Sequence, residues 1–290
     1  MMTQTGEVAL MKLFPFCDDF GRSAAGRGVV TTNDGGLIVL GERWEGVRYT
    51  HTSRVAAWLL KFDAGMDTVW TKTYTYGTDR HTLGTSLAHS LDGGYVIAGC
   101  SGVIHEWCPD YRKKLWLMKT DGDGSPLWQY VSGGTGIEEG NSVVSAADGG
   151  FVVAGTTNSM GAGLEDVYVI KVDGSGNLLW ERTFGGTQAD AGACIIASSD
   201  GGFVIAGSTE VPGALEQPSH FDVYRVKIDG LGNKIWEKTY GGPKDDCAYG
   251  IAPASGGGYV VVGTTESYGP APSNAYVMKI DESGELWEAP

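Results

Sequence analysis

The sequence predicts an all-β protein that consists of five copies of one four-stranded unit, which we expect to form a five-bladed β-propeller of antiparallel blades. Three observations support this class: a repeat of 52 to 58 residues, short apolar runs between glycine-rich turns, and no sustained helical period in the 290 residues. Glycine is the compositional outlier, with 46 residues. That content suits a chain with many tight turns, because glycine adopts positive φ angles without a steric cost.

The repeat is defined by a Lys-x-Asp motif, followed by a glycine-containing turn and then a tryptophan. The stretch "KVDGSGNLLWERTFGG" at 171–186 returns 56 residues later as "KIDGLGNKIWEKTYGG" at 227–242. A second turn lies about 28 residues before each lysine and reads Asp-Gly-Gly in four copies and Gly-Gly-Gly in the fifth. The lysines are Lys61, Lys119, Lys171, Lys227 and Lys279, and the tryptophans are Trp70, Trp128, Trp180, Trp236 and Trp287. We therefore expect one domain over residues 1–290, with repeats at about 24–77, 82–134, 138–186, 190–242 and 246–290.

Each copy reads as four short strands, labelled a to d. In the third copy strand a is small and apolar ("SVVSA"), strand b is a continuous apolar run ("FVVAG") and strand c reads "VYVIKVD". The continuous run predicts burial on both faces, whereas the charged residues of strand d ("LLWERTF") predict an outer, half-exposed edge. The Asp-Gly between strands a and b predicts a type I′ hairpin turn. Four-stranded sheets that repeat along a chain are typical of propeller blades.

The two ends of the chain both offer a strand d for the last blade. Residues 6–14 ("GEVALMKLF") align without a gap on residues 176–184 ("GNLLWERTF"), so we expect the N-terminal strand to complete the last blade and close the ring. The segment at 285–290 ("ELWEAP") competes for the same place, and the sequence leaves both possibilities open. A stacked solenoid is the alternative architecture, but it needs atypical capping units at its ends.

These motifs resemble those of bacterial and archaeal β-propeller repeat proteins, whose repeats read GGTxxDxG…DGGYVVAGxTxS…KxDxxGNxxW. The resemblance covers nearly all of the chain and is most complete in the third to fifth copies. That family is largely uncharacterised, so the resemblance implies a fold and often a surface or secreted setting, and no activity. The Asp-x-x-Gly-x-x-x-Trp hairpin is also similar to the Asp-box turns of sialidases, which are structural in that family.

A motif copied five times around one domain cannot mark a single active site. We therefore interpret Lys171, Asp173, Gly176 and Trp180 as structural. The aspartate is expected to accept hydrogen bonds from backbone N–H groups of its own turn, and the tryptophan to fill space between neighbouring blades. Function is expected on the b–c loops and d–a linkers, which share the other end of the sheets and vary most between copies.

The composition excludes some partners. A net charge of −14 argues against nucleic acid or an anionic membrane surface as a main partner, and no apolar run approaches the roughly 18 residues of a spanning helix. The five cysteines are scattered and odd in number, which does not suggest a disulfide framework. The first residues lack the pattern of a signal peptide, so a cytoplasmic protein and a secreted protein with its leader removed both fit the sequence. We expect a monomer.

The variable face carries aromatic and imidazole side chains that suit a small molecule, a glycan or a peptide. Exposed rings stack on such ligands, and arginines stand beside several of them. The alternative is that these rings only fold the long loops against the blades. The predicted ligand-binding residues are Trp44, Tyr49, His51, Trp107, Tyr111 and His220.

Acidic residues recur in the d–a linkers, where fivefold geometry would bring them close to the mouth of a central channel. A ring of carboxylates suits Ca²⁺ or another divalent ion, whereas the alternative is that each acid closes its own turn through local backbone N–H groups. The loop "CSGVIHEWCPDYRKK" at 100–114 adds imidazole, thiolate and carboxylate, which are ligands of Zn²⁺, although its spacing matches no structural zinc pattern. The predicted metal-binding residues are Asp19, Asp79, Glu138, Asp190, Asp246 and Cys108.

Two functions follow from these features. The first is a ligand-binding or interaction propeller, because the sequence contains no G-x-S-x-G, phosphate-binding loop or nucleophilic cysteine signature. The second is a metal-assisted hydrolase of esters, lactones or phosphoesters, in which an ion at the channel mouth lowers the pKa of bound water. Its candidate catalytic residues are His81, His105 and Glu106. A glycosidase with paired carboxylates is weaker, because no acid departs from the repeat in a way that marks a pair.

Overall fold

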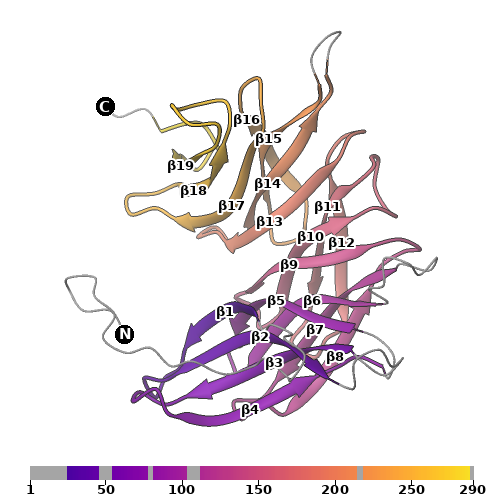
Figure 1. Cartoon of the computed structure of the whole chain (residues 1–290), viewed down its shortest axis with the longest axis vertical. Helices are drawn as coiled ribbons and strands as arrows, with labels where there is room; N and C mark the ends of the chain where they lie inside the picture. Colours follow the sequence, from indigo (N-terminus) through magenta and orange to yellow (C-terminus); the bar gives the residue numbers. More distant parts are fainter. Residues whose placement is uncertain (1–24, 46–53, 78–80, 103–111, 214–217, 288–290) are drawn as a thin grey trace. The chain divides into compact units, whose positions relative to one another are not determined.

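The computed structural model describes residues 25–45, 54–77, 81–102, 112–213 and 218–287. These ranges contain nineteen β-strands and no helix (Figure 1), so the prediction of an all-β fold is confirmed. The same ranges accordingly hold no helix of the length and hydropathy that crossing a membrane requires. By their contacts the strands group into two compact units, residues 1–84 and 85–290.

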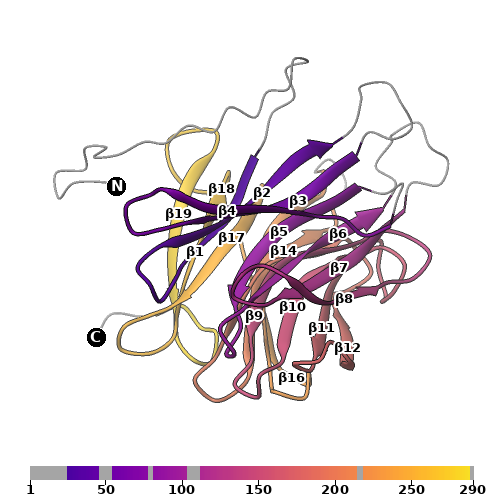
Figure 2. The same cartoon turned by 90° about the horizontal axis from the view of Figure 1, so that it is seen from below.

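Each repeat forms one antiparallel sheet whose strands pair in chain order. The first sheet contains β1 (Ala25–Thr31), β2 (Leu37–Glu45), β3 (Arg54–Phe62) and β4 (Thr68–Tyr74). The second contains β5 (His81–His89), β6 (Tyr95–Gly102), β7 (Lys113–Thr120) and β8 (Pro126–Ser132). The third contains β9 (Glu138–Ser145), β10 (Phe151–Thr157), β11 (Asp166–Val172) and β12 (Leu178–Phe184), which lie side by side in Figure 2. The fourth contains β13 (Asp190–Ala197), β14 (Phe203–Val211), β15 (His220–Ile228) and β16 (Lys234–Tyr240), and the fifth contains β17 (Asp246–Pro253), β18 (Tyr259–Thr265) and β19 (Asn274–Ile280).

The five predicted blades thus correspond to four sheets of four strands and one sheet with three strands among the described residues. The predicted closing strand, residues 6–14, lies outside the described residues, and closure of the sheets into a ring stays a prediction. At the other end Leu286 forms an isolated bridge with Ile280, and the Trp287 N–H donates to the Lys279 carbonyl oxygen at 2.9 Å. Residues 286 and 287 therefore lie beside the end of β19, where a fourth strand would begin.

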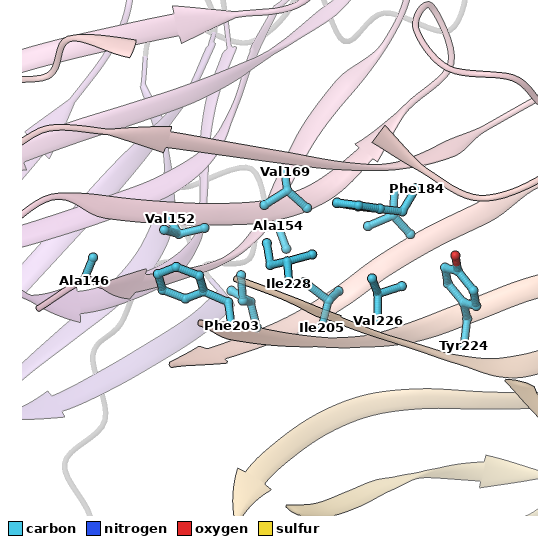
Figure 3. Close-up of a cluster of buried hydrophobic side chains, with 12 residues drawn as sticks. Ala146, Val152, Ala154, Val169, Phe184, Phe203, Ile205, Tyr224, Val226 and Ile228 are labelled. Carbon is cyan, nitrogen blue, oxygen red and sulfur yellow. The ribbon is translucent and has the colours of Figure 1, made fainter. Parts of the chain in front are cut away.

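The core of the second unit lies between successive sheets. In the cluster of Figure 3, Val152 and Ala154 of the third sheet pack with Phe203 and Ile205 of the fourth. Each such side chain contributes about 1.5–3 kcal/mol when it is fully removed from water, less for alanine. In the third sheet strand b is buried on both faces as predicted, because every residue from 151 to 155 is buried, whereas in the fifth sheet Val262 of strand b is exposed. Strands β12 and β16 are mostly exposed or half-buried, which confirms the prediction for strand d.

The a–b turn differs from the predicted type I′ geometry. A type I′ turn requires positive φ at both central residues, but Met66 is the only described non-glycine residue with a positive φ. In the a–b turn of the third sheet only Gly149 has a positive φ, at 84°. Its N–H donates to the Ala146 carbonyl oxygen at 3.0 Å, and the Ala146 N–H donates to that of Gly150 at 2.9 Å. This is a type I turn closed by a glycine bulge, so the type I′ prediction is wrong.

Each strand b also contains a glycine that the sequence pattern alone leaves unexplained. The partner strand a has a β-bulge opposite Gly155, Gly207 and Gly263. A Cβ on Gly207 would overlap the carbonyl oxygen of Ala191, and the other two glycines meet a carbonyl in the same way. Glycine is required at this position because two backbones approach each other too closely for any side chain.

The c–d turn and the strand-d tryptophan have the structural roles that the sequence predicts. The Asp173 Oδ1 accepts hydrogen bonds from the N–H groups of Ser175 at 2.8 Å and Asn177 at 2.9 Å. In the second unit the indole N–H of three strand-d tryptophans donates to a carbonyl oxygen in the c–d turn of the next sheet. These bonds run from Trp128 to Gly174 at 3.0 Å, from Trp180 to Gly230 at 3.3 Å and from Trp236 to Glu282 at 3.0 Å. The tryptophans therefore join neighbouring sheets.

The contact between the tryptophan and the c–d turn of the next sheet explains why that turn contains glycine. Gly176 has a φ of 85°, and a Cβ there would lie 2.8 Å from the Trp128 ring. The last copy departs from this arrangement. In the last copy Trp287 follows Asp281 by six residues, whereas the other tryptophans follow their aspartate by seven. Trp287 is 41% exposed, and the Lys279 Nζ lies 3.7 Å from its ring centroid.

The repeated lysine pairs with the aspartate of the a–b turn in its own sheet. The Lys171 Nζ lies 2.6 Å from the Asp148 Oδ2, and Lys119 pairs with Asp92 in the same way. These lysine side chains are more than nine-tenths buried, so the turn carboxylate neutralises a charge that has left water. The fifth copy has Gly256 in place of the aspartate, and Lys279 has no ion pair in the described ranges.

These ion pairs predict a loss of stability in acid. The hydrogen bond from Lys119 lowers the pKa of Asp92 to about 2. Because this folded-state pKa lies below the usual value of about 3.9, the stabilisation is present above pH 4 and disappears as the pH falls toward 2. The carboxylate is half exposed, so Asp92→Asn should cost about 0.5–1 kcal/mol at pH 6 and almost nothing at pH 2, as measured by urea unfolding. Asp123→Asn, which removes an acid that pairs with no cation among the described residues, is the control; equal losses in both variants would contradict a role of the ion pair.

Candidate ligand-binding site

Most of the predicted site residues lie outside the described part of the chain. They are Asp19, Tyr49, His51, Asp79, His105, Glu106, Trp107, Cys108 and Tyr111, and their roles stay predictions. The candidates that the structure describes are Trp44, His81, Glu138, Asp190, His220 and Asp246. Trp44 and His81 belong to the first unit, and the other four belong to the second.

His81 begins β5 and is buried, with 6% of its surface exposed. Its Nδ1 accepts a hydrogen bond from the Val55 N–H at 3.0 Å. Its ring meets the Trp44 ring edge-on, with the centroids 5.7 Å apart. These contacts give His81 a packing role between strands of the first unit, and its predicted catalytic role stays a prediction.

The described linker acids, Glu138, Asp190 and Asp246, occupy the same place at the start of strand a, and all three are buried. The Asp190 Oδ2 accepts a hydrogen bond from the Gly186 N–H at 2.7 Å, and the Asp246 Oδ2 accepts one from the Gly242 N–H at 2.8 Å. Asp190 and Asp246 therefore accept hydrogen bonds from backbone N–H groups of their own turns, which is the structural alternative to a metal-binding role. Within the ranges that the structure describes, no three His, Cys, Asp or Glu side chains form a group that suits a metal ion, and the metal site stays a prediction.

A second charged residue, at the start of strand c, lies beside each of these acids, and the sequence pattern did not reveal it. Asp222 and Asp246 both lie beside Gly241. Burial raises the pKa of Asp222, and the charge of Asp246 acts in the same direction, whereas His220, whose Nε2 is 3.7 Å from the Asp222 Oδ1, opposes them. The equivalent pairs at the two preceding junctions are Asp166 with Asp190 and Lys114 with Glu138.

A cavity of about 340 Å³ begins between the fourth and fifth sheets, where Asp246 lines it, and extends around the edge of β19 to Val277 and Trp287, where the fourth strand of the fifth sheet is expected. Its aromatic wall comes from Tyr240 at the end of β16 and Tyr268 in the b–c loop after β18. These two rings stack with centroids 5.9 Å apart and planes 25° apart. The Tyr268 hydroxyl donates to the Gly241 carbonyl oxygen at 2.9 Å, and the Asn274 Nδ2 donates to the Tyr268 carbonyl oxygen at 2.9 Å. The wall is therefore fixed before any ligand arrives.

Two polar atoms of residues that line this cavity have no hydrogen-bond partner among the described residues. They are the Oδ1 of Asp246, a residue with 1% exposure, and the hydroxyl of Tyr276 on β19. Burial raises the pKa of Tyr276, so its hydroxyl remains protonated and able to donate. Neither atom is special to this cavity. The Asp190 Oδ1 is likewise without a partner, and the hydroxyl groups of Tyr168 and Tyr224 donate to the glutamate that follows the strand-d tryptophan, a position that lies outside the described residues in the last copy.

Arg225 on β15 lies behind the cavity wall and departs from the repeat. It is 3% exposed, its Nε has no hydrogen-bond partner, and its Nη1 lies 3.5 Å from the Met278 Sδ. No carboxylate in the described ranges forms an ion pair with it, and burial lowers its pKa. The equivalent positions in the other copies hold Leu59, Leu117, Val169 and Val277. The sequence shows this replacement of an aliphatic residue by arginine, but the comparison of motifs did not single it out.

A second cavity, of about 390 Å³, lies among the a–b and c–d turns of the third and fourth sheets. Its lining includes Asp148, Lys171 and Gly202, which belong to the repeat and have the structural partners described above. The residues of this cavity that we can assign a role are therefore structural residues of the repeat, and the cavity is a weaker candidate for a ligand site.

No protein-family model matches the chain. The chain is 30% identical over 185 residues to the regulatory protein FlaEY of Caulobacter vibrioides; the match covers 60% of this chain and 19% of that protein, so the chain spans about a fifth of its length. Among solved structures it is similar to a polysaccharide lyase of family PL25, an ulvan lyase, both alone and bound to -[GlcA(1-4)Rha3S]-. Both comparisons give a TM-score of 0.53 at 11% identity and cover 89% of this chain and 65% of the lyase. This similarity concerns the fold, and it supports an architecture of repeated, propeller-like sheets.

Proposed function

We propose that the chain is a carbohydrate-binding propeller whose ligand occupies the cavity between the fourth and fifth sheets. The observation that carries the proposal is the stacked pair Tyr240 and Tyr268, whose rings form one wall of the cavity and are held in place by hydrogen bonds. Aromatic faces stack on the apolar faces of sugar rings, and sugar hydroxyl groups donate and accept at the same time. The volume of about 340 Å³ lies within the range of small-molecule sites.

One part of the cavity lining belongs to the face on which the sequence predicts ligand binding, whereas Lys279 and Trp287 lie beside the c–d turn at the other end of the sheet. Tyr268 lies in a b–c loop and Asp246 follows a d–a linker. The ulvan lyase with a similar fold was solved with -[GlcA(1-4)Rha3S]- bound, which makes oligosaccharides the first ligand class to test. The hydrolase alternative stays a prediction, because two of its candidate catalytic residues, His105 and Glu106, lie outside the described residues.

Tyr268→Ala is expected to weaken oligosaccharide binding by at least about 10-fold, because it removes one stacked ring, a loss of about 1.4 kcal/mol. Isothermal titration of the full chain against a panel of neutral and acidic oligosaccharides measures this. The matched control is Tyr249→Ala, which removes a tyrosine that is 62% exposed on β17 and does not line the cavity. Equal affinities in the two variants would place the site elsewhere, and no binding by any sugar would reject the function.

We also infer that the sheets are blades of one closed ring. In the second unit β9 contacts β13 and β13 contacts β17, so successive sheets pack through their first strands. The face of the fifth sheet that points away from the fourth exposes Tyr249, Val262 and Val277, an apolar surface that a further sheet would cover. Hydrogen exchange of the full chain and of a form without residues 1–24 tests this: the amides at the outer edge of β19 should be protected in the first and lose that protection in the second, and equal exchange in both would contradict closure by the N-terminal strand.

A further inference from the structure

We propose that the ligand of this cavity is an amino sugar, a carbohydrate with a protonated amine, whose positive charge lies at the end of the cavity that Asp246 lines. The inference rests on the proposed carbohydrate site and adds the chemical class of the ligand. An ammonium group is attracted by carboxylates and by the faces of aromatic rings. The carboxylates act on it as charges over a short distance and need not touch it.

The first support is a pair of carboxylates beside the aromatic wall. The Asp222 Oδ1 and the Asp246 Oδ2 both lie within 3.0 Å of the point that a Cβ of Gly241 would occupy, so the two carboxylates are neighbours. The carbonyl oxygen of the same glycine accepts the hydrogen bond from the Tyr268 hydroxyl at 2.9 Å. Burial is the first cause of the raised pKa of Tyr268, and the charges of Asp246 and Asp222 also raise it. The stacked tyrosines therefore have negative charge at one edge.

The second support is the balance of charge at this end of the cavity. The linker before β17, the b–c loop after β18 and the start of β15 carry more acidic than basic residues. The acids are Asp222, Asp245, Asp246 and Glu266, and the bases are His220 and Lys244. The segments of these two repeats outside the described residues, 214–217 and 288–290, contain no lysine, arginine or histidine. An ammonium group on the ligand offsets this excess, whereas a carboxylate or a sulfate is repelled by it.

The third support is that an aromatic wall and an acid pair occur together only here among the described junctions of the second unit. Asp166 and Asp190 form an acid pair at the junction of the third and fourth sheets. Phe184 and Pro212 occupy there the positions of the two tyrosines, so that junction has no pair of stacked rings. At the junction before it the acid pairs with a lysine. A sugar ring and an ammonium group of one ligand therefore find both partners only between the fourth and fifth sheets.

The test compares tetrasaccharides that differ in one substituent of each ring. The full chain is titrated at about pH 6, where the amine is protonated, with the β-1,4-linked tetramer of glucosamine. Cellotetraose, which has a hydroxyl group in place of each amine, and the N-acetylated tetramer, which has a neutral amide, are the uncharged ligands. We expect the glucosamine tetramer to bind at least about 10-fold more tightly than either of them.

Three variants show whether this preference comes from the site. Asp222→Asn and Asp246→Asn keep the shape of each side chain and remove its charge, and in both the preference should fall below about 3-fold. Asp123→Asn is the matched control, because it removes the same charge from the turn between β7 and β8 of the second sheet and should retain the full preference.

Tyr268→Ala separates binding in the cavity from general attraction to a chain with a net charge of −14, and it should weaken binding of the glucosamine tetramer at least about 10-fold. If the charged and uncharged tetramers bind equally, the inference is wrong while the carbohydrate site stands. The same holds if the preference survives in Asp222→Asn and Asp246→Asn, or falls equally in Asp123→Asn. If no sugar binds, or if Tyr268→Ala binds as the unmodified chain does, the site itself is wrong, and the inference fails with it.

Discussion

Gly207→Ala is expected to lower the free energy of unfolding by about 2–4 kcal/mol, a large effect for the addition of one methyl group. The new Cβ would overlap the carbonyl oxygen of Ala191, which belongs to the bulge of β13. Because the obstacle is backbone rather than a flexible side chain, β13 and β14 must change their register to make room. Urea unfolding followed by tryptophan fluorescence measures the loss.

The matched control is Gly186→Ala, in the linker between the third and fourth sheets. A Cβ at Gly186 meets nothing within 4 Å, and the residue does not have a left-handed φ. We expect a change within about 0.5 kcal/mol. Equal effects of the two substitutions would show that the strand-b glycine is not required by the bulge.

Trp180→Ala is expected to cost about 2–4 kcal/mol, because it removes the link between the third and fourth sheets. The ring packs against the core cluster and beside Gly232, and its N–H donates to the Gly230 carbonyl oxygen at 3.3 Å. Trp180→Phe keeps most of the packing and loses only the hydrogen bond, so it should cost about 1 kcal/mol. Equilibrium unfolding of both variants separates the two contributions.

Trp287→Ala provides the comparison, since Trp287 is out of step with the repeat and 41% exposed. Its removal should cost less than about 1 kcal/mol in the absence of ligand. A loss as large as that of Trp180→Ala would mean that the tryptophans do not stabilise the chain by joining sheets.

The repeat allows the fold class to be predicted because its signals are local. The Asp173 turn, the buried run at 151–155 and the charged strand d each follow from residues close together in the chain, and the structure contains all three. The a–b turn was predicted wrongly, because Asp-Gly fits both a type I′ turn and a type I turn with a bulge, and only the φ of Asp148 separates them. The role of Gly207 depends on a bulge in another strand, which no local pattern reveals.

The candidate site could be predicted only in part. The choice of the b–c loops and d–a linkers includes Tyr268 and Asp246, because variation between copies concentrates there. Arg225 is visible as a departure from an aliphatic position, yet its neighbours Tyr276 and Met278 come from another sheet about 50 residues away. Their meeting depends on how the sheets pack, which is a long-range property of the fold.

We infer that residues shared by the five copies build the sheets and that Arg225, which departs from the copies, contributes nothing to their stability. Unfolding of Arg225→Leu in urea without ligand tests this division most directly. Because leucine already occupies the equivalent position at Leu117, we predict a higher unfolding midpoint, equal to a gain of about 1–3 kcal/mol from removing an unpartnered buried charge. A fall in stability of similar size would show that Arg225 supports the fold, and it would contradict the division.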